Sequence, residues 1–108
     1  MTLAELYNLL NSITELNRKV TYRAWPVGEA PELPFICYLE TSTDNFKADG
    51  KVYKKIQNVD IELYTAKKEP STEYLIEDAL DGANIAWEKS ETWIESENCY
   101  EITYEITL

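Results

Sequence analysis

The chain has 108 residues, of which 44% are hydrophobic, so it is long enough and apolar enough for a single hydrophobic core. Its 20 Asp and Glu residues against 10 Lys and Arg give a formal net charge of −10. This charge argues against an independent nucleic-acid binder, because DNA affinity comes mainly from basic side chains on phosphates, and equally against adhesion to anionic lipid. No apolar run approaches the roughly 18 residues that span a bilayer. We expect one domain over residues 1–108, with no membrane segment and no signal peptide.

The N-terminal segment, residues 2–16, is predicted to be an amphipathic helix. Thr2 and Glu5 have the spacing of a capping box, in which a hydroxyl and a carboxylate satisfy the first backbone amides of a helix. The polar run 17–19 follows and ends the helix. Apolar residues recur at helical spacing between these limits and give one apolar stripe, formed by Leu3, Leu6, Tyr7, Leu10 and Ile13.

Strands are predicted for three stretches before the second helix. Residues 20–25 are β-branched and aromatic, and the prolines and glycine of 26–34 then predict an extended loop. Residues 35–39 are a continuous apolar run, which is typical of a strand buried on both faces. The polar stretch 41–50 is interpreted as a loop with one large apolar side chain, Phe46. Strand character then returns, most clearly in the alternating apolar residues Val59, Ile61 and Leu63.

A second helix and two further strands are predicted in the C-terminal part. Pro70 suits the first turn of a helix, whose buried face is expected to consist of Leu75, Ile76, Ala79, Leu80 and Ala83. Residues 85–89 are interpreted as a strand that is followed by a polar connection around Ser90, and residues 98–108 alternate over a full strand. This order of elements predicts an α+β fold, with a mostly antiparallel sheet of about four or five strands and both helices packed on one face.

The sequence offers little catalytic chemistry. It contains no histidine, which removes the commonest general base and most zinc sites. Cys37 and Cys99 are far apart in sequence, lie in apolar strand-like segments and are interpreted as buried thiols in a reducing cytoplasm. A disulfide between them is the alternative if their strands are adjacent. The segment 44–49 lacks the oxygen spacing of a calcium loop, and the three glycines form no phosphate loop. We predict that the protein is not an enzyme and has no cofactor or metal.

The aromatic content suits a protein that works by contact with other proteins. Tyrosine supplies 8 residues and tryptophan 3, and both types are enriched where protein surfaces meet. Most of them are expected in the core and the sheet. Trp25, directly before the proline-rich loop, and Phe46, in the polar loop, are different, because core burial is less automatic there and they suit an interface as well as a core.

The middle of the chain resembles a known family. The stretches that carry the resemblance are Ala24–Phe35, Cys37–Leu39, Asp44–Asp49, Val52–Tyr53, Ile61–Thr65, Lys67–Lys68 and Ile94–Glu97. In these stretches the chain is similar to the small tail-completion, or tail-terminator, proteins of siphophages and prophages of Gram-positive bacteria. The resemblance covers roughly residues 20–108 and carries no catalytic motif. Its most specific parts are Asp44–Asp49 and the stretch from Leu63 to Lys68.

The resemblance implies a structural role in the virion. Tail terminators are α+β domains that assemble as a ring, typically a hexamer, on the last ring of a finished tail tube. The ring stops tube polymerisation and presents the surface that docks on the DNA-filled head. The implied partners are other copies of the chain, the tail-tube protein and the head or neck connector proteins, first in the host cytoplasm and then in the tail or neck of the virion. The candidate interface residues are Trp25, Asp44, Asn45, Phe46 and Tyr53.

A mechanism for such a ring follows as a hypothesis. A ring needs two different patches on each subunit that meet on neighbouring copies. An edge strand formed by residues 98–108 would extend the sheet of the neighbour, and the loop 41–51 would reach an adjacent subunit or the tail tube with Phe46 as its apolar anchor. The excess carboxylates would line the lumen and let DNA pass without specific binding.

Other functions stay open at the level of sequence. A head-closure or head–tail adaptor protein of the neck has a similar size and is the first alternative. A small acidic inhibitor or DNA mimic is the second, and it would concentrate carboxylates on one continuous face. An enzyme is the third, and it would need a deep pocket with perturbed carboxylates, which the absence of histidine disfavours.

Overall fold

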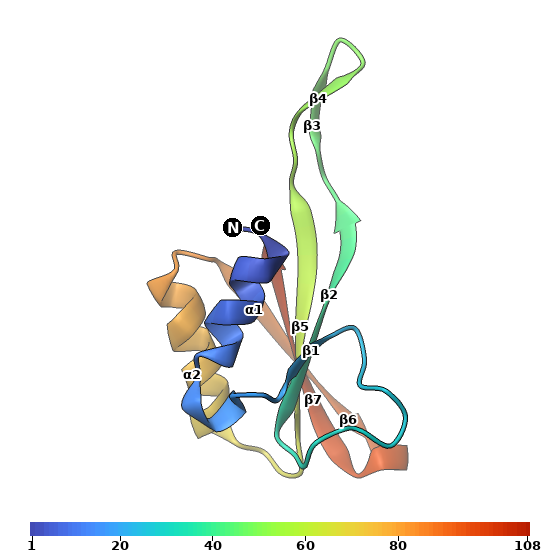
Figure 1. Ribbon diagram of the computed structural model, residues 1–108, viewed down its shortest axis with the longest axis vertical. Helices are drawn as coiled ribbons and strands as arrows, with labels where there is room; N and C mark the ends of the chain where they lie inside the picture. The colour runs from blue at the N-terminus through green and yellow to red at the C-terminus, as the bar shows by residue number, and fades with distance from the viewer.

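The computed structural model describes residues 1–108 and contains a five-stranded sheet, a two-stranded hairpin and two α-helices (Figure 1). The strand order of the sheet is β1-β2-β5-β7-β6, and every pair is antiparallel except β1 with β2. The predicted α+β class with a mostly antiparallel sheet is confirmed. The elements are α1 Leu3–Asn11, η1 Thr14–Leu16, β1 Val20–Tyr22, β2 Phe35–Thr43, β3 Phe46–Ala48, β4 Lys51–Lys54, β5 Gln57–Thr65, α2 Pro70–Gly82, β6 Trp87–Ile94, η2 Glu95–Glu97 and β7 Cys99–Thr107.

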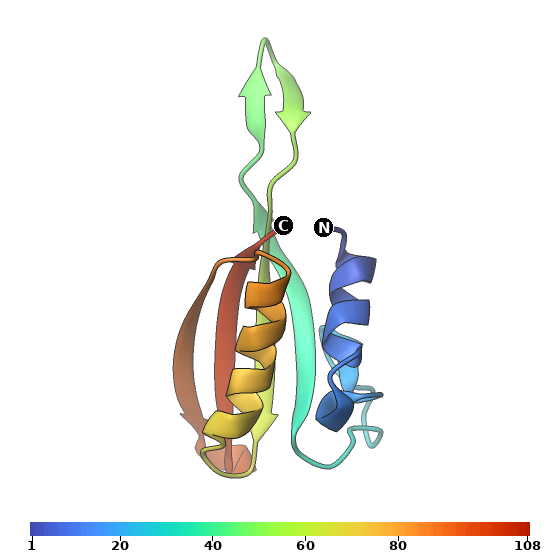
Figure 2. The same ribbon diagram turned by 90° about the vertical axis from the view of Figure 1, so that its left-hand side faces the viewer.

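Both helices cover the same face of the sheet, as the order of elements predicts. Figure 2 shows α1 and α2 side by side in front of the sheet, α1 on the side of β2 and α2 on the side of β7. Neither α-helix lies on the opposite face, and the loop 23–34, between β1 and β2, lies on that side (Figure 1). Neither helix is long and apolar enough to cross a membrane.

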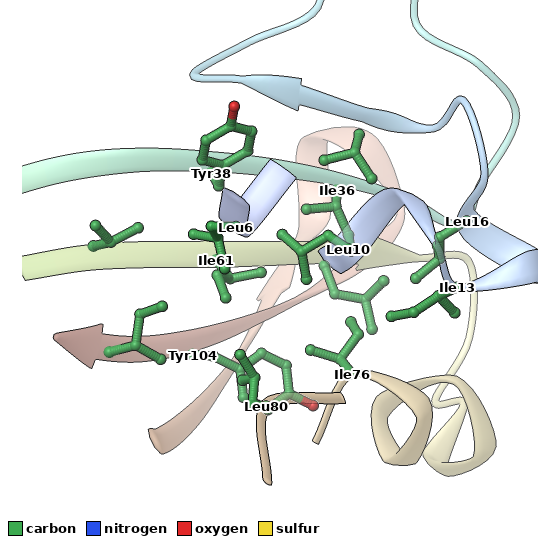
Figure 3. Close-up of a cluster of buried hydrophobic side chains, with 14 of the residues drawn as sticks. Leu6, Leu10, Ile13, Leu16, Ile36, Tyr38, Ile61, Ile76, Leu80 and Tyr104 are labelled. Atoms are coloured by element: carbon green, nitrogen blue, oxygen red, sulfur yellow. The ribbon is translucent and has the colours of Figure 1, made fainter. Parts of the chain in front are cut away.

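The core lies between the helices and the sheet (Figure 3). Leu6 and Leu10 of α1 and Ile76 and Leu80 of α2 have no solvent-exposed surface, and Ile61 of the central strand β5 lies between them. Burial of each such side chain stabilises the fold by about 1.5–3 kcal/mol. Fifteen residues form this one cluster, namely Leu6, Leu10, Ile13, Leu16, Val20, Ile36, Tyr38, Val59, Ile61, Leu63, Ile76, Leu80, Ile102, Tyr104 and Ile106.

The first helix begins as predicted and ends earlier. The capping box is present, since the Thr2 hydroxyl accepts from the Glu5 amide at 3.1 Å and the Glu5 carboxylate accepts from the Thr2 amide at 3.0 Å. The helix ends at Asn11, because Ser12 donates its hydroxyl to the Leu9 carbonyl and Ile13 adopts an extended backbone. The prediction of a helix over 2–16 is therefore too long. A short 3-10 turn, η1, continues the apolar pattern and still buries Leu16.

The second helix starts at Pro70 as predicted, but its buried face includes charge. Glu73 is buried with only 2% of its side chain exposed, and its carboxylate lies 2.8 Å from Lys68 Nζ and 3.1 Å from Lys89 Nζ. Lys89 Nζ also lies 2.7 Å from Glu77, which accepts a 2.8 Å hydrogen bond from the Tyr104 hydroxyl. This ion cluster joins α2 to β6 and β7 on the helix side of the sheet.

The C-terminal strands differ from the prediction in one respect that matters for assembly. β6 runs unbroken through Ser90 and pairs with β7 along its whole length, so the predicted connection at Ser90 is wrong. The turn lies instead at η2, where Asn98 adopts a left-handed backbone with φ 49°. β7 is paired on both sides, with β5 and β6. The expectation that residues 98–108 form an edge strand is therefore wrong, and the edges are β1 and β6.

The predicted loop 41–50 is a strand end and a hairpin. β2 continues to Thr43, and β3 and β4 form an antiparallel ladder in which Ala48 pairs with Lys51. The two residues between them, Asp49 and Gly50, have φ of 51° and 73°. Aspartate and glycine tolerate positive φ, which two-residue hairpin turns of this kind require.

Candidate functional site

Residues 44–56, called the hairpin below, project from the end of the sheet. Figure 1 shows them continuing β2 and β5 along the longest axis of the molecule and away from the helices. Two predicted interface residues hold the root of the hairpin. Asp44 donates its amide to the Ile56 carbonyl at 2.9 Å and accepts from the Asn58 side chain at 2.6 Å. The Asn45 side chain accepts from the Ile56 amide at 3.0 Å.

The outer part of the hairpin exposes large apolar side chains. Phe46 of β3 is 60% exposed, and Tyr53 and Val52 of β4 are 63% and 47% exposed. Covering an exposed apolar side chain with a partner is favourable, by about 25 cal/mol for each Å² of surface removed from water. The hairpin is therefore an arm whose large apolar side chains are not covered by their own domain.

The hairpin also differs in charge from the rest of the chain. It contains four of the ten basic residues and only two carboxylates, those of Asp44 and Asp49, so its formal charge is +2. The other 95 residues therefore carry a formal charge of −12, and the two parts sum to the net charge of −10. A basic arm on an acidic body is an arrangement that favours contact with an acidic surface. The four basic residues are Lys47, Lys51, Lys54 and Lys55.

The sheet face opposite the helices, called the open face below, carries a row of carboxylates. Asp60 of β5 lies directly opposite Glu105 of β7, which lies directly opposite Glu88 of β6. Glu62 and Glu101 lie on the same face in the following rows. No lysine or arginine occupies this face of the four long strands. Its positions are Phe35, Cys37, Leu39, Ser42, Asn58, Asp60, Glu62, Tyr64, Glu88, Ser90, Thr92, Ile94, Cys99, Glu101, Thr103, Glu105 and Thr107.

The carboxylates of the open face repel one another, and no cationic side chain lies among them. Burial raises the pKa of Asp60, and the neighbouring carboxylates of Glu105 and Glu101 raise it further. Burial raises the pKa of Glu62 as well, with Glu101 and Asp60 adding to the effect while the Tyr64 hydroxyl opposes it. An open hollow of about 460 Å³ lies over the row, between β5, β7 and β6. Both raised pKa values mean that the negative charges of Asp60 and Glu62 are disfavoured in the folded protein, so their neutralisation is favourable.

The far end of the open face is apolar. Trp25 lies in the loop 23–34, is half-buried and packs edge-on against Phe35 with ring centroids 6.1 Å apart. Phe35 in turn packs against Tyr64 at 5.3 Å. An apolar hollow of about 290 Å³ opens beside them, lined mainly by Ala30, Leu33, Phe35, Tyr64, Ile94 and Cys99.

The predicted interface residues therefore fall in two groups. Asp44, Asn45, Phe46 and Tyr53 come together in the hairpin, the first two at its root and the last two on its exposed strands. Trp25 lies apart from them, because Phe35 beside it pairs at the opposite end of β5 from the hairpin. None of these five positions lies in the row of carboxylates. The sequence did not predict which carboxylates would face one another on neighbouring strands.

The two cysteines both lie on the open face and are free. They sit on β2 and β7, with β5 between these strands, and they are offset along the strands, so the geometry for a disulfide is absent. Burial raises the pKa of Cys37 to about 11, with the Glu62 carboxylate adding to the effect. Burial and the carboxylates of Glu97 and Glu101 raise the pKa of Cys99. Both thiols are therefore poor nucleophiles near neutral pH.

Comparison with known proteins adds no relative. No protein-family model matches the chain, and no curated protein matches it at a significant level. No three His, Cys, Asp or Glu side chains are grouped so that they could hold a metal ion. The hairpin and the open face are thus defined by the geometry and charge of this chain itself.

Proposed function

We propose that this protein is a structural virion subunit of a siphophage or prophage, which forms a ring that terminates the tail tube and provides the surface for head–tail joining. One observation carries the proposal: an arm with exposed Phe46 and Tyr53 projects beyond the domain. A subunit that caps a polymer must reach copies and partners outside its own body. The most specific part of the resemblance to tail terminators, Asp44–Asp49, falls within this arm.

The elements suit a ring that is built head to tail. Each subunit offers its neighbour two different surfaces, the hairpin at one end and the sheet at the other, and unlike surfaces generate rings rather than closed pairs. The sheet edges available for pairing with a neighbour are β1 and β6, in place of the internal strand β7. Carboxylates left facing the lumen repel the DNA backbone, so DNA passes without adhering. The proposal assigns no catalytic step.

The direct test combines the purified protein with tail-tube protein and observes the product by light scattering and electron microscopy. The expected result is a ring that caps the tube and stops its growth. Phe46→Ala should weaken capping while the monomer stays folded by circular dichroism, because the side chain makes little contact with its own domain. Tyr74→Ala is the matched control, since Tyr74 is a 65% exposed aromatic on α2. Absence of rings and of capping by the wild-type chain overturns the proposal.

A neck position is the nearest alternative, in which the same subunit closes the head or adapts head to tail. The two positions are separated by the particle with which the protein co-purifies. A terminator is expected on tails made in a head-defective background, and a head-closure or adaptor protein on DNA-filled heads.

The open face favours a second candidate function, that of a small acidic inhibitor or DNA mimic. Its carboxylates lie on one continuous sheet face, as such a protein requires. That function predicts a complex with a basic protein which double-stranded DNA displaces and which high ionic strength dissociates. A complex that persists in excess DNA counts against mimicry.

A further inference from the structure

The basic hairpin and the acidic open face belong to one chain but do not meet within it. The hairpin continues the sheet outward along its long axis, so it does not fold back over the strands (Figure 1). All four ion pairs of the molecule involve Lys68 or Lys89 with Glu73, Glu77 or Glu91 on the helix side. The hairpin lysines and the open-face carboxylates are thus left without partners of opposite charge.

We infer that the hairpin of one copy docks on the open face of a neighbouring copy, with its lysines against the row formed by Asp60, Glu105 and Glu88. The partner is a second copy of this chain, because the chain itself supplies both complementary surfaces. This inference rests on the ring assembly proposed above and names the contact that builds the ring.

The dimensions of the two surfaces agree. The three carboxylates of the row lie on adjacent strands, so they span two inter-strand spacings, or about 10 Å. A two-stranded hairpin has a backbone about 5 Å wide, which leaves room for lysines to reach carboxylates on both sides. The hollow over the row, about 460 Å³, leaves space for a hairpin side chain such as Phe46. The side chains of Val59 and Ile106 beside it are buried in the core on the helix side.

Electrostatics favour this contact over an empty face. Asp60 is partly desolvated and is repelled by the carboxylates of Glu105 and Glu101, and a cationic side chain that approaches the row offsets that repulsion. The exposed hairpin lysines reach out on flexible stems, which suits fast, salt-sensitive association. Burial of the hairpin's apolar residues adds a contribution that salt does not screen.

The test reverses charge on each surface separately and then mixes the two variants. The hairpin variant is Lys47→Glu, Lys51→Glu, Lys54→Glu, and the face variant is Glu88→Lys, Glu105→Lys, all at exposed positions. Self-association of the full chain is measured by sedimentation over a concentration series at low ionic strength. Lys67→Glu and Glu95→Lys, exposed positions outside both surfaces, are the controls. The melting temperature of each variant shows that it folds.

Each reversed variant alone should associate about tenfold more weakly or worse, since it presents two surfaces of like charge. An equimolar mixture should recover association, because each variant's hairpin then meets an open face of opposite charge. The controls should associate like the wild type. A mixture that stays as weak as its folded components overturns the inference, and so does a wild-type chain that stays monomeric through the series.

Failure of this contact and failure of the proposed function have different signatures. Recovery of association in the mixture needs no tail-tube protein. If the mixture associates but the wild type caps no tube, the contact stands and the proposed function is overturned. Capping of tubes that is equally strong for both reversed variants would keep the function and overturn the contact. A reciprocal dimer as the only rescued species keeps the docking and contradicts the ring.

Discussion

Neutralising one carboxylate of the open face should stabilise the isolated protein and weaken its assembly. Asp60→Asn is the cleanest change, because asparagine keeps the size of the side chain and Asn58 already occupies the same face of β5. Asp60 lies directly opposite Glu105, and like charges directly opposite each other destabilise a sheet by about 0.2–1 kcal/mol. Solvent screens a partly exposed pair, so we expect a gain of about 0.5 kcal/mol.

The pH dependence follows from the direction of the pKa shift. The pKa of Asp60 in the folded protein is raised above its ordinary value of 3.8, so protonation favours the folded state. Stability from this group is therefore complete below pH 3.8, and it is lost as pH rises through the raised pKa. The variant should accordingly be more stable than the wild type at neutral pH, and the difference should vanish in acid below pH 3.8.

The assay is thermal unfolding by circular dichroism at several pH values, combined with sedimentation. A gain of about 0.5 kcal/mol raises the melting temperature of a domain of this size by about 2–4 °C. Asp78→Asn, an exposed carboxylate on α2, is the control and should change neither quantity. A melting temperature that falls, or a gain that is the same at neutral and acid pH, would refute the electrostatic reasoning. A gain in stability without loss of association would refute the docking role of the row.

Further predictions concern the helix side and the thiols. Glu73→Gln should lower stability by about 1–2 kcal/mol at neutral pH, because it removes a buried charge between Lys68 and Lys89, both themselves partly exposed. Contacts with carboxylates raise the pKa of both lysines, so the wild type should lose this stabilisation as pH rises through those values, and the penalty of the variant should shrink in alkali. Cys37 and Cys99, which are buried, should react with a maleimide only as fast as the protein unfolds; rapid labelling of the native protein would contradict their burial.

The sheet was predictable where one face of a strand is buried. β7 alternates Ile102, Tyr104 and Ile106 with polar residues because only its helix side meets the core. The same rule applies to β5 and to the helices, whose apolar spacing follows from their periods. For these elements the local pattern and the tertiary environment agree, so the order of elements was enough to predict the class of fold.

The continuation of β6 beyond residue 89 was missed because charged side chains replace apolar ones in the middle of its helix side. Lys89 and Glu91 face α2 and pair there with Glu77 and Lys68. A strand that meets its neighbour through ion pairs has no apolar alternation, so the polar residues on either side of Ser90 resembled a connection.

The hairpin was missed for a related reason. No face of β3 or β4 is buried, so no period of two appears in the sequence. The turn itself carried a usable signal, because Asp49-Gly50 is a favoured pair for two-residue hairpin turns. The concentration of lysines in this segment was also visible in the sequence. The row of carboxylates was not, because it depends on the register of β5, β7 and β6, which residues far apart in sequence determine together.

Carboxylates have opposite effects on stability on the two faces of the sheet, and this contrast bears on the role of the acidity of the chain. On the helix side the buried Glu73 is neutralised by two lysines, so its charge stabilises the monomer. On the open face Asp60, Glu88 and Glu105 stand opposite one another without a cation, so their charge destabilises the monomer. A single neutral substitution would relieve that repulsion, which means that the row is not explained by the stability of the isolated domain. The docking proposed above would explain it, because the hairpin of a second copy is the segment of this chain with the required charge.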